Sequence, residues 1–133
     1  PLGTHLYICG PKGMIDWVVN EASKLGWPNE TIHYEEFLAP KPGKPFQVKL
    51  SASNKVVNVG ENESLLEAIE REGVDAPYLC RGGACGQCET SVIEADGEFI
   101  HRDHWLEDDD KSSGKKIMPC VSRFDGKTLV LDR

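Results

Sequence analysis

The sequence predicts an α+β fold in two parts, and three observations lead to this expectation. Residues 5–37 read as strand, helix and strand, residues 39–45 are rich in proline, and residues 46–133 hold five short β-prone segments around one amphipathic helix. At 133 residues, the chain is long enough for one ordinary domain and a smaller piece. We therefore expect a small first part at 1–38, a linker at 39–45 and a domain at 46–133.

The first part has the pattern of an α/β unit. "HLYIC" at 5–9 is rich in strand-forming residues, Pro11 suits the first turn of a helix, and apolar residues then recur at helical spacing up to Leu25. Gly26 is placed as a C-cap, and "TIHYEEF" comes next as a second strand. Because so few elements bury little apolar area, we expect them to end a larger α/β domain or to pack against the domain at 46–133.

The linker and the domain after it differ in composition. "APKPGKP" at 39–45 holds three prolines, a glycine and two lysines, which favours an extended, solvated segment. "FQVKLSAS" and "KVVNV" then predict a hairpin through Ser53 and Asn54, and "ESLLEAIEREG" predicts a helix with Asn62 or Ser64 as its N-cap. Further strands are expected at 89–95, 116–122 and 128–132. Together these elements predict a compact α+β roll.

Charge and hydropathy exclude two classes of partner. With 22 acidic and 15 basic residues the net charge is −7, so nucleic acid is a poor partner. No apolar run approaches the ~20 residues of a membrane span, and the N-terminal residues lack the pattern of a signal peptide. We expect a cytoplasmic protein without a membrane partner. Asp108–Asp110 is interpreted as a solvated turn, with a docking patch for a basic surface as the other interpretation.

The five cysteines are Cys9, Cys80, Cys85, Cys88 and Cys120. An odd number with three clustered members suits metal binding better than a disulfide framework. The spacing Cys-x4-Cys-x2-Cys with a remote fourth cysteine is the plant-type ligand spacing of a [2Fe–2S] cluster. Zinc is a weaker alternative because its structural sites usually present two close pairs, and a Rieske centre would need two histidines beside the cysteines. Cys9 is expected to be a buried, small apolar residue.

The residues between these cysteines are small. Gly82, Gly83, Ala84 and Gly86 leave the backbone N–H groups of the loop free to turn toward a negatively charged cluster. Arg81 is the one charged side chain of "CRGGACGQC", and it is expected to face the cluster or a partner.

"APYLCRGGACGQCETSV" closely resembles the cluster loop of plant-type [2Fe–2S] ferredoxins, and the resemblance continues through "IMPCVSR" to "LVLDR". It covers about residues 46–133 and implies a β-grasp fold, in which a mixed sheet cradles one helix. The residues that match the family's ligands are Cys80, Cys85, Cys88 and Cys120. Those that match the loop wrapping the cluster are Arg81, Gly82, Gly83, Ala84, Gly86 and Gln87.

"HLYICGPKGMIDWVVNEASKLGW", together with "IHYEEF" after it, resembles the end of the NAD-binding domain of ferredoxin-reductase-like flavoproteins. This domain order is similar to that of phthalate dioxygenase reductases, including vanillate demethylase reductases, in which FMN, NAD and [2Fe–2S] modules succeed one another. The resemblance implies that residues 1–38 are a remnant of the NAD-binding domain. Cys9, Gly10 and Pro11 match positions beside the nicotinamide, and Phe37 matches an aromatic residue against the flavin.

The resemblance also implies a function. Such reductases take a hydride from NADH and pass single electrons from the reduced flavin to a Rieske-type oxygenase. Without the flavin domain and most of the NAD-binding domain, we expect this chain alone to carry electrons but not to oxidise NADH. In the full-length protein, its partners would be its own flavin and NAD domains and the terminal oxygenase component. An independent ferredoxin and a metal-stabilised interaction module without a redox role are the alternatives.

Overall fold

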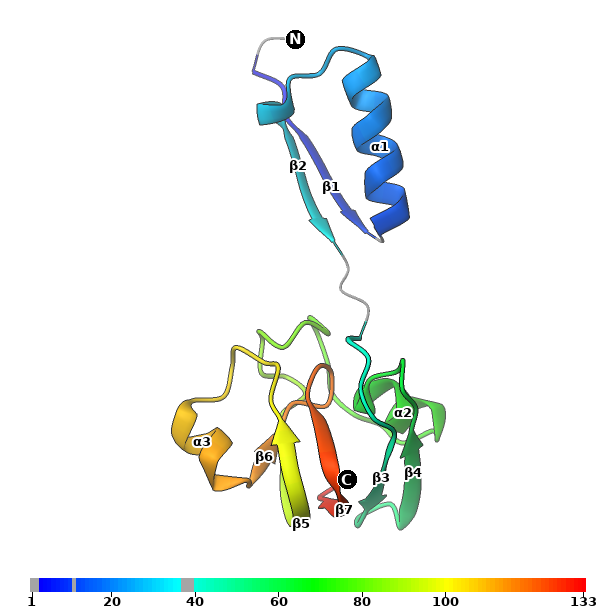
Figure 1. The fold of residues 1–133 in the computed structure, drawn as a ribbon, viewed down its shortest axis with the longest axis vertical. Helices are drawn as coiled ribbons and strands as arrows, with labels where there is room; N and C mark the ends of the chain where they lie inside the picture. The colour runs from blue at the N-terminus through cyan, green and yellow to red at the C-terminus, as the bar shows by residue number, and fades with distance from the viewer. Residues whose placement is uncertain (1–2, 11, 37–39) are drawn as a thin grey trace. The chain divides into compact units, whose positions relative to one another are not determined.

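The computed structural model describes residues 3–10, 12–36 and 40–133, and two compact units make up the chain (Figure 1). The first unit is Pro1–Ala39 and the second is Pro40–Arg133. The expectations for Pro11 and Phe37 fall outside the described residues.

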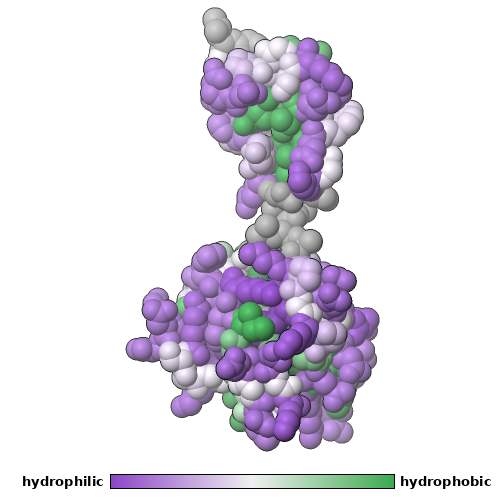
Figure 2. Space-filling model, viewed as in Figure 1, coloured by the Kyte–Doolittle hydropathy of each residue, from purple (hydrophilic) through white to green (hydrophobic). Residues whose placement is uncertain are grey.

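The first unit has strands β1 (Leu6–Gly10) and β2 (Ile32–Glu36), helix α1 (Lys12–Lys24) and a short 3₁₀ turn η1 (Asn29–Thr31). The two strands pair in parallel, from Leu6 opposite Ile32 to Gly10 opposite Glu36. Few of its apolar side chains are buried, and large ones such as Trp17 and Leu25 are exposed. Figure 2 shows an apolar patch on this unit.

Cys9 is exposed, so the expectation of a buried residue is wrong. The reason is the alternation of side chains along a strand. In β1 the half-buried residues are Leu6 and Ile8, whereas Tyr7 and Cys9 alternate with them and are exposed. A parallel sheet is normally covered on both faces, and in the described part of this unit α1 packs on it.

The second unit is a five-stranded mixed sheet with one helix packed on it. Its elements are β3 (Phe46–Leu50), β4 (Lys55–Val59), α2 (Leu65–Arg71), β5 (Thr90–Ile100), α3 (Asp108–Ser113), β6 (Lys116–Ile117) and β7 (Arg123–Leu131). The strand order is β4-β3-β7-β5-β6, in which β3 and β7 are parallel and the other neighbours antiparallel. This arrangement confirms the β-grasp expectation. None of the described helices is long and apolar enough to cross a membrane.

Helix α2 supplies the centre of the core. Ser64 is its N-cap and forms a capping box with Glu67, whose side chain accepts from the Ser64 N–H in return. The apolar face of the helix packs against alternate residues of the central strands, and several of these side chains are fully buried: Leu65, Leu66, Ile69, Val48, Leu50, Val57 and Leu131. The cysteines at 88 and 120 belong to the same core.

Three expectations about the later elements need correction. The expected strand at 116–122 ends at Ile117, because the N–H groups of Val121 and Ser122 both donate to the carbonyl of Met118 and close a turn around Cys120. Strands β5 and β7 are longer than predicted because they pair with each other over most of their length. Asp108–Asp110 forms the first turn of α3, where acidic side chains interact favourably with the helix dipole.

Candidate metal centre

The four clustered cysteines come from two segments of the second unit. Cys80, Cys85 and Cys88 lie on the loop between α2 and β5, and Cys120 lies in the turn between β6 and β7. The Sγ atoms of Cys88 and Cys120 are 3.2 Å apart. The N–H of Cys80 is 3.5 Å from the Sγ of Cys85, and the side chains of these two cysteines also interact. The four cysteines are therefore arranged as two neighbouring pairs.

The two pairs differ in burial. Cys88 and Cys120 are each 4% exposed and are part of the core. Cys85 is half-buried and Cys80 is exposed, next to Leu79, which is 73% exposed. One end of the site is therefore set into the core, and the other end faces solvent.

Backbone N–H groups point at the sulfurs of the exposed pair. The N–H of Gly82 lies 3.3 Å from the Cys80 Sγ. The loop can turn in this way because Arg81, Gly83 and Gly86 all have positive φ values, of 52°, 78° and 77°. The N–H groups of Gly82 and Ala84 are thus placed to stabilise negative charge on the Cys80 sulfur.

The loop rests on a second segment, residues 101–106. The N–H of His104 donates to the carbonyl of Gly83 over 2.9 Å. A Cβ on Gly83 would lie 2.7 Å from Val121, and one on Gly86 would lie 2.3 Å from the ring of Trp105. The glycines are needed here because other groups approach their backbone closely.

Asp103 fixes this supporting segment. Its carboxylate is buried and accepts from the N–H of Leu106 at 2.9 Å and from the hydroxyl of Ser122 at 3.1 Å. Burial alone would raise the pKa of Asp103, but these hydrogen bonds hold it below its usual value. Sequence reasoning missed this role, because an aspartate near a run of acidic residues carries no signal of burial.

The sulfurs have shifted acidities. Burial raises the pKa of the Cys80 thiol, but the backbone N–H groups of Ala84 and Gly82 outweigh it and lower this pKa to about 6. The hydrogen bond with Cys120 lowers the pKa of Cys88 to about 7. The same bond, together with burial, raises the pKa of Cys120. The surroundings thus favour the thiolate, the form that binds metal, at Cys80 and Cys88 but not at Cys120.

The side chain of Arg81 is directed to α2 and to Tyr78. Its guanidinium makes two bonds to the Glu70 carboxylate on α2, of 3.0 and 2.6 Å, and lies 3.8 Å from the ring centroid of Tyr78. These contacts raise the pKa of Arg81. Ala84 and Gln87 are exposed on the outside of the loop. Of these three residues, Ala84 has a backbone N–H that interacts with the Cys80 thiol.

The paired arrangement fits a two-iron cluster. Each iron of a [2Fe–2S] cluster takes two protein ligands, which is the number that each sulfur pair offers. A structural zinc ion would need all four sulfurs around one point.

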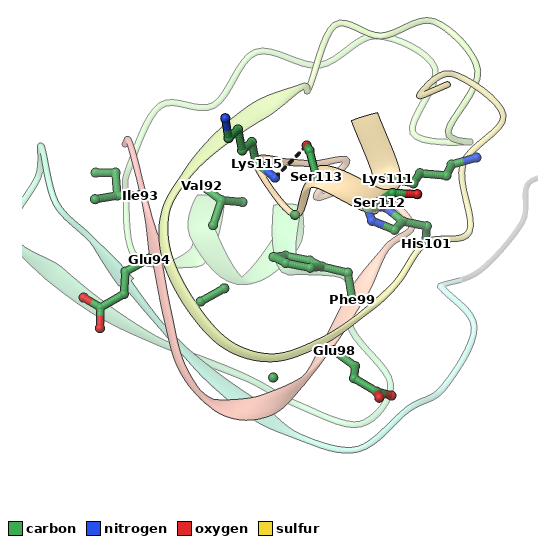
Figure 3. Close-up of a pocket in the computed structure, with 13 residues that line it drawn as sticks. Val92, Ile93, Glu94, Glu98, Phe99, His101, Lys111, Ser112, Ser113 and Lys115 are labelled. Carbon is green, nitrogen blue, oxygen red and sulfur yellow. Dashed lines mark hydrogen bonds between the residues drawn. The ribbon is translucent and has the colours of Figure 1, made fainter. Parts of the chain in front are cut away.

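A separate cavity of about 520 Å³ lies beside β5 and α3, and no cysteine lines it (Figure 3). The figure shows Phe99 inside the curl of β5, with Glu94 and Glu98 directed away. His101 stacks on Phe99 with ring centroids 5.6 Å apart, and its Nδ1 lies 3.6 Å from the Asp103 carboxylate. The cavity is therefore distinct from the cysteine site.

Comparisons with known proteins agree with this site. Residues 48–125 match the family described as "2Fe-2S iron-sulfur cluster binding domain". The chain is 47% identical over 131 residues to the heme-dependent oxidative N-demethylase beta subunit of Ectopseudomonas mendocina, covering 98% of this chain and 41% of that protein. It is also 47% identical to the carnitine monooxygenase reductase subunit of Acinetobacter pittii, over 99% of this chain and 43% of that protein.

A solved structure of phthalate dioxygenase reductase, described as modular for electron transfer from pyridine nucleotides to [2Fe-2S], matches all of this chain and 41% of its own. The TM-score is 0.63 at 38% identity. The chain thus spans about two fifths of the length of these relatives. On the match over most of the second unit, the chain belongs to the 2Fe-2S iron-sulfur cluster binding domain family, and its cofactor is a [2Fe–2S] cluster.

Proposed function

We propose that Cys80, Cys85, Cys88 and Cys120 are the four ligands of the cluster. The observation that carries this proposal is the grouping of these cysteines in two neighbouring pairs, one within the core and one at the surface. When bound, a [2Fe–2S] cluster supplies one-electron redox chemistry. The backbone N–H groups of the loop stabilise negative charge at the sulfurs, and the buried pair keeps water from one side of the site.

We further propose that the chain is the ferredoxin part of an NADH-dependent oxygenase reductase. In this function it takes single electrons from a reduced flavin and passes them to a terminal oxygenase component. The names of its relatives support the proposal, since two of them are reductases of oxygenase systems. The exposed edge formed by Leu79 and Cys80 is the surface through which we expect electrons to enter and leave.

The first unit supports the same assignment. Its parallel strands and single helix, with many exposed apolar side chains, suit a piece of a larger α/β domain. We propose that this larger domain binds NAD, that Cys9, Gly10 and Pro11 lie near the nicotinamide, and that Phe37 lies near a flavin, FMN, in the full-length protein. Clustered thiols that must stay reduced favour a cytoplasmic location.

The oxygenase partner is proposed to be of the Rieske type, as the sequence suggests. One comparison favours a second candidate, because a relative that is 47% identical carries the name of a heme-dependent demethylase subunit. A heme-dependent oxygenase is therefore the alternative acceptor. The two acceptors are distinguished by experiment and not by the fold of this chain.

The test uses the cluster-loaded chain, reduced without oxygen and mixed with an acceptor. The acceptors are the oxygenase component of carnitine monooxygenase and a heme-dependent oxidative N-demethylase, with cytochrome c as a general one-electron acceptor. Return of the visible absorbance bands measures electron loss. We expect fast reoxidation by one of the two oxygenases, and reoxidation by cytochrome c alone would contradict the oxygenase function.

A matched pair of variants tests the exposed edge. Leu79→Ser changes an apolar side chain beside Cys80, whereas Val56→Ser changes one that is 52% exposed on β4. Because partner contact should be made at the edge, we expect Leu79→Ser to slow electron transfer to the oxygenase several-fold and Val56→Ser to leave it unchanged. Equal rates for the two variants would contradict the assignment of this edge.

A further inference from the structure

Two arginines hold the proline-rich segment that precedes the ferredoxin sheet. Arg102 donates to the carbonyls of Lys41 and Pro42, over 2.6 and 3.0 Å. Arg123 donates to the carbonyls of Gly43 and Lys44, over 3.2 and 2.8 Å. Four successive carbonyls of residues 41–44 are thus bound by guanidinium groups of the second unit.

Arg123 is buried, and its guanidinium also binds the segment before α2. It is 2% exposed, and it also donates to the carbonyls of Gly60 and Glu63 near the start of α2. A buried guanidinium is costly unless it is hydrogen-bonded, and burial lowers the pKa of Arg123. The carbonyls of residues 43, 44, 60 and 63 together accept hydrogen bonds from most of its N–H groups. The bonds to residues 43 and 44 therefore offset part of the cost of burying the guanidinium.

The segment itself is shaped to fit the arginine. A Cβ at Gly43 would lie 2.5 Å from the Nε of Arg123, so a larger residue would displace the guanidinium. The N–H of Gly43 donates to the carbonyl of Glu61 over 3.0 Å, and Lys44 pairs with Asp125 at 2.7 Å. The segment predicted to be a solvated linker is extended and largely exposed, but it is fastened along its length.

This fastening leaves fewer residues between the last strand of the first unit and the first held residue of the second unit. From Glu36, the end of β2, to Lys41 the chain makes five Cα-to-Cα steps, which reach at most about 18 Å. If residues 41–45 were free, the ten steps to Phe46 would reach about 35 Å. A shorter tether raises the effective concentration of one domain near the other.

We propose that Arg102 and Arg123 are positioning residues for electron transfer within the full-length protein, because they limit how far the ferredoxin domain can move from the domain before it. This inference rests on the proposed function. Arg102 also links the proline-rich segment to the residues that support the cysteine loop. Its backbone N–H donates to Ser122, whose hydroxyl donates to Asp103.

The first test measures backbone order by ¹⁵N relaxation in the oxidised, cluster-loaded chain. In the parent chain, we expect order parameters near about 0.85 at Lys41, Gly43 and Lys44. In Arg102→Gln, Lys41 should fall below about 0.6 while Gly43 stays ordered, because Arg123 and Glu61 still hold it. Unchanged order at Lys41 in this variant, or a mobile segment in the parent, would overturn the proposal.

Two further variants complete this test. Arg133→Gln is the matched control, because Arg133 donates to the carbonyl of Glu89 and to Thr90, away from the linker. It should leave residues 41–44 ordered. Arg123→Lys keeps the charge but not the planar fork, and it should lower the order of Gly43 and Lys44 while Arg102 still holds Lys41. If Arg123→Lys fails to fold, Arg102→Gln still decides the result.

The second test measures cluster reduction in the full-length protein after mixing with NADH. Releasing residues 41 and 42 lengthens the tether from five steps to seven, so Arg102→Gln should slow flavin-to-cluster transfer about 1.7-fold, with flavin reduction unchanged. An unchanged rate despite a mobile Lys41 would overturn the positioning role. If the parent transfers no electrons from flavin to cluster, the proposed function is wrong. In that case the order parameters alone test whether the two arginines hold residues 41–44.

Discussion

The two cysteine pairs of this protein are held in different ways. Cys88 and Cys120 sit in the same core as Met118 and the apolar face of α2, and they are almost fully buried. Cys80 and Cys85 sit on a loop whose backbone amides and positive φ values set their positions. Side-chain packing fixes one half of the site, and local backbone conformation fixes the other half.

This difference assigns a role to each half. In the proposed site, the buried pair would anchor the cluster to the fold, because moving either cysteine would disturb the core. The exposed pair brings the site to the surface, where a partner can approach Leu79 and Cys80. Variants that disturb one half of the site at a time should therefore have unequal effects.

Serine substitution should separate the two pairs most clearly. Loss of any one of the four ligands should abolish cluster binding, measured by visible absorbance and iron content. In the metal-free chain, Cys88→Ser should cost about 1–3 kcal/mol of unfolding free energy because it puts a hydroxyl into the core. Cys80→Ser should cost under about 0.5 kcal/mol because the site is exposed.

Cys9→Ser is the control for these variants, and it should bind a normal cluster. Urea unfolding of the metal-free variants measures the free energies. Equal costs for Cys88→Ser and Cys80→Ser would contradict the division of the site, and retention of the cluster by either would contradict their role as ligands.

The glycines of the loop offer a matched pair. Gly83→Ala should destabilise the folded chain by about 1–3 kcal/mol, because its φ is +78° and a Cβ would lie 2.7 Å from Val121. Gly82→Ala should have a smaller effect, since the nearest atom would be at 3.7 Å. Thermal unfolding of both variants measures the difference, and equal melting temperatures would show that the loop does not need Gly83.

The acidities of the thiols predict a difference in reactivity. In the metal-free chain the Cys80 thiol has a pKa of about 6, below the 9.0 of an ordinary thiol. The reactive thiolate therefore forms as the pH rises through 6, so iodoacetamide labelling of Cys80 should increase between about pH 5 and 7. The raised pKa and burial of Cys120 should keep it unlabelled in that range. Peptide mass spectrometry identifies the labelled cysteine, and earlier labelling of Cys120 would contradict the account.

Arg81 should give the smallest effect. Its bonds to Glu70 are partly exposed, so Arg81→Gln should cost less than about 1 kcal/mol of unfolding free energy. Cluster content should stay unchanged, because the guanidinium contacts α2 and Tyr78 instead of the sulfurs. Urea unfolding and iron analysis measure both quantities. A large loss of iron would restore the sequence-based expectation that this side chain faces the cluster.

Local patterns in the sequence predicted much of this structure. The strand at 55–59, the helix behind Ser64 and the cysteine spacing depend on neighbouring residues, so the sequence was sufficient for them. The length of β5 and β7 was not predictable in this way, because it comes from pairing between segments that are distant in the sequence.

The residues that contact and support the cysteine loop could not be predicted for the same reason. Asp103, Trp105 and Val121 touch the loop only after the chain has folded, and no spacing rule connects them to Gly83 or Gly86. Arg81 was expected to face the cluster or a partner, and in the structure its guanidinium contacts Glu70 and the ring of Tyr78. Its partner Glu70 lies on α2, and the spacing of the two residues in the sequence does not predict that they meet.

Counting the metal ions bound by the intact chain is the sharpest test of the two-pair site. The chain is loaded in a medium that holds iron, sulfide and zinc, purified without oxygen and analysed for all three. Two sulfur pairs predict about two iron and two sulfide atoms per chain, with a red-brown colour that bleaches on reduction. A colourless chain holding one zinc ion and no sulfide would contradict the account.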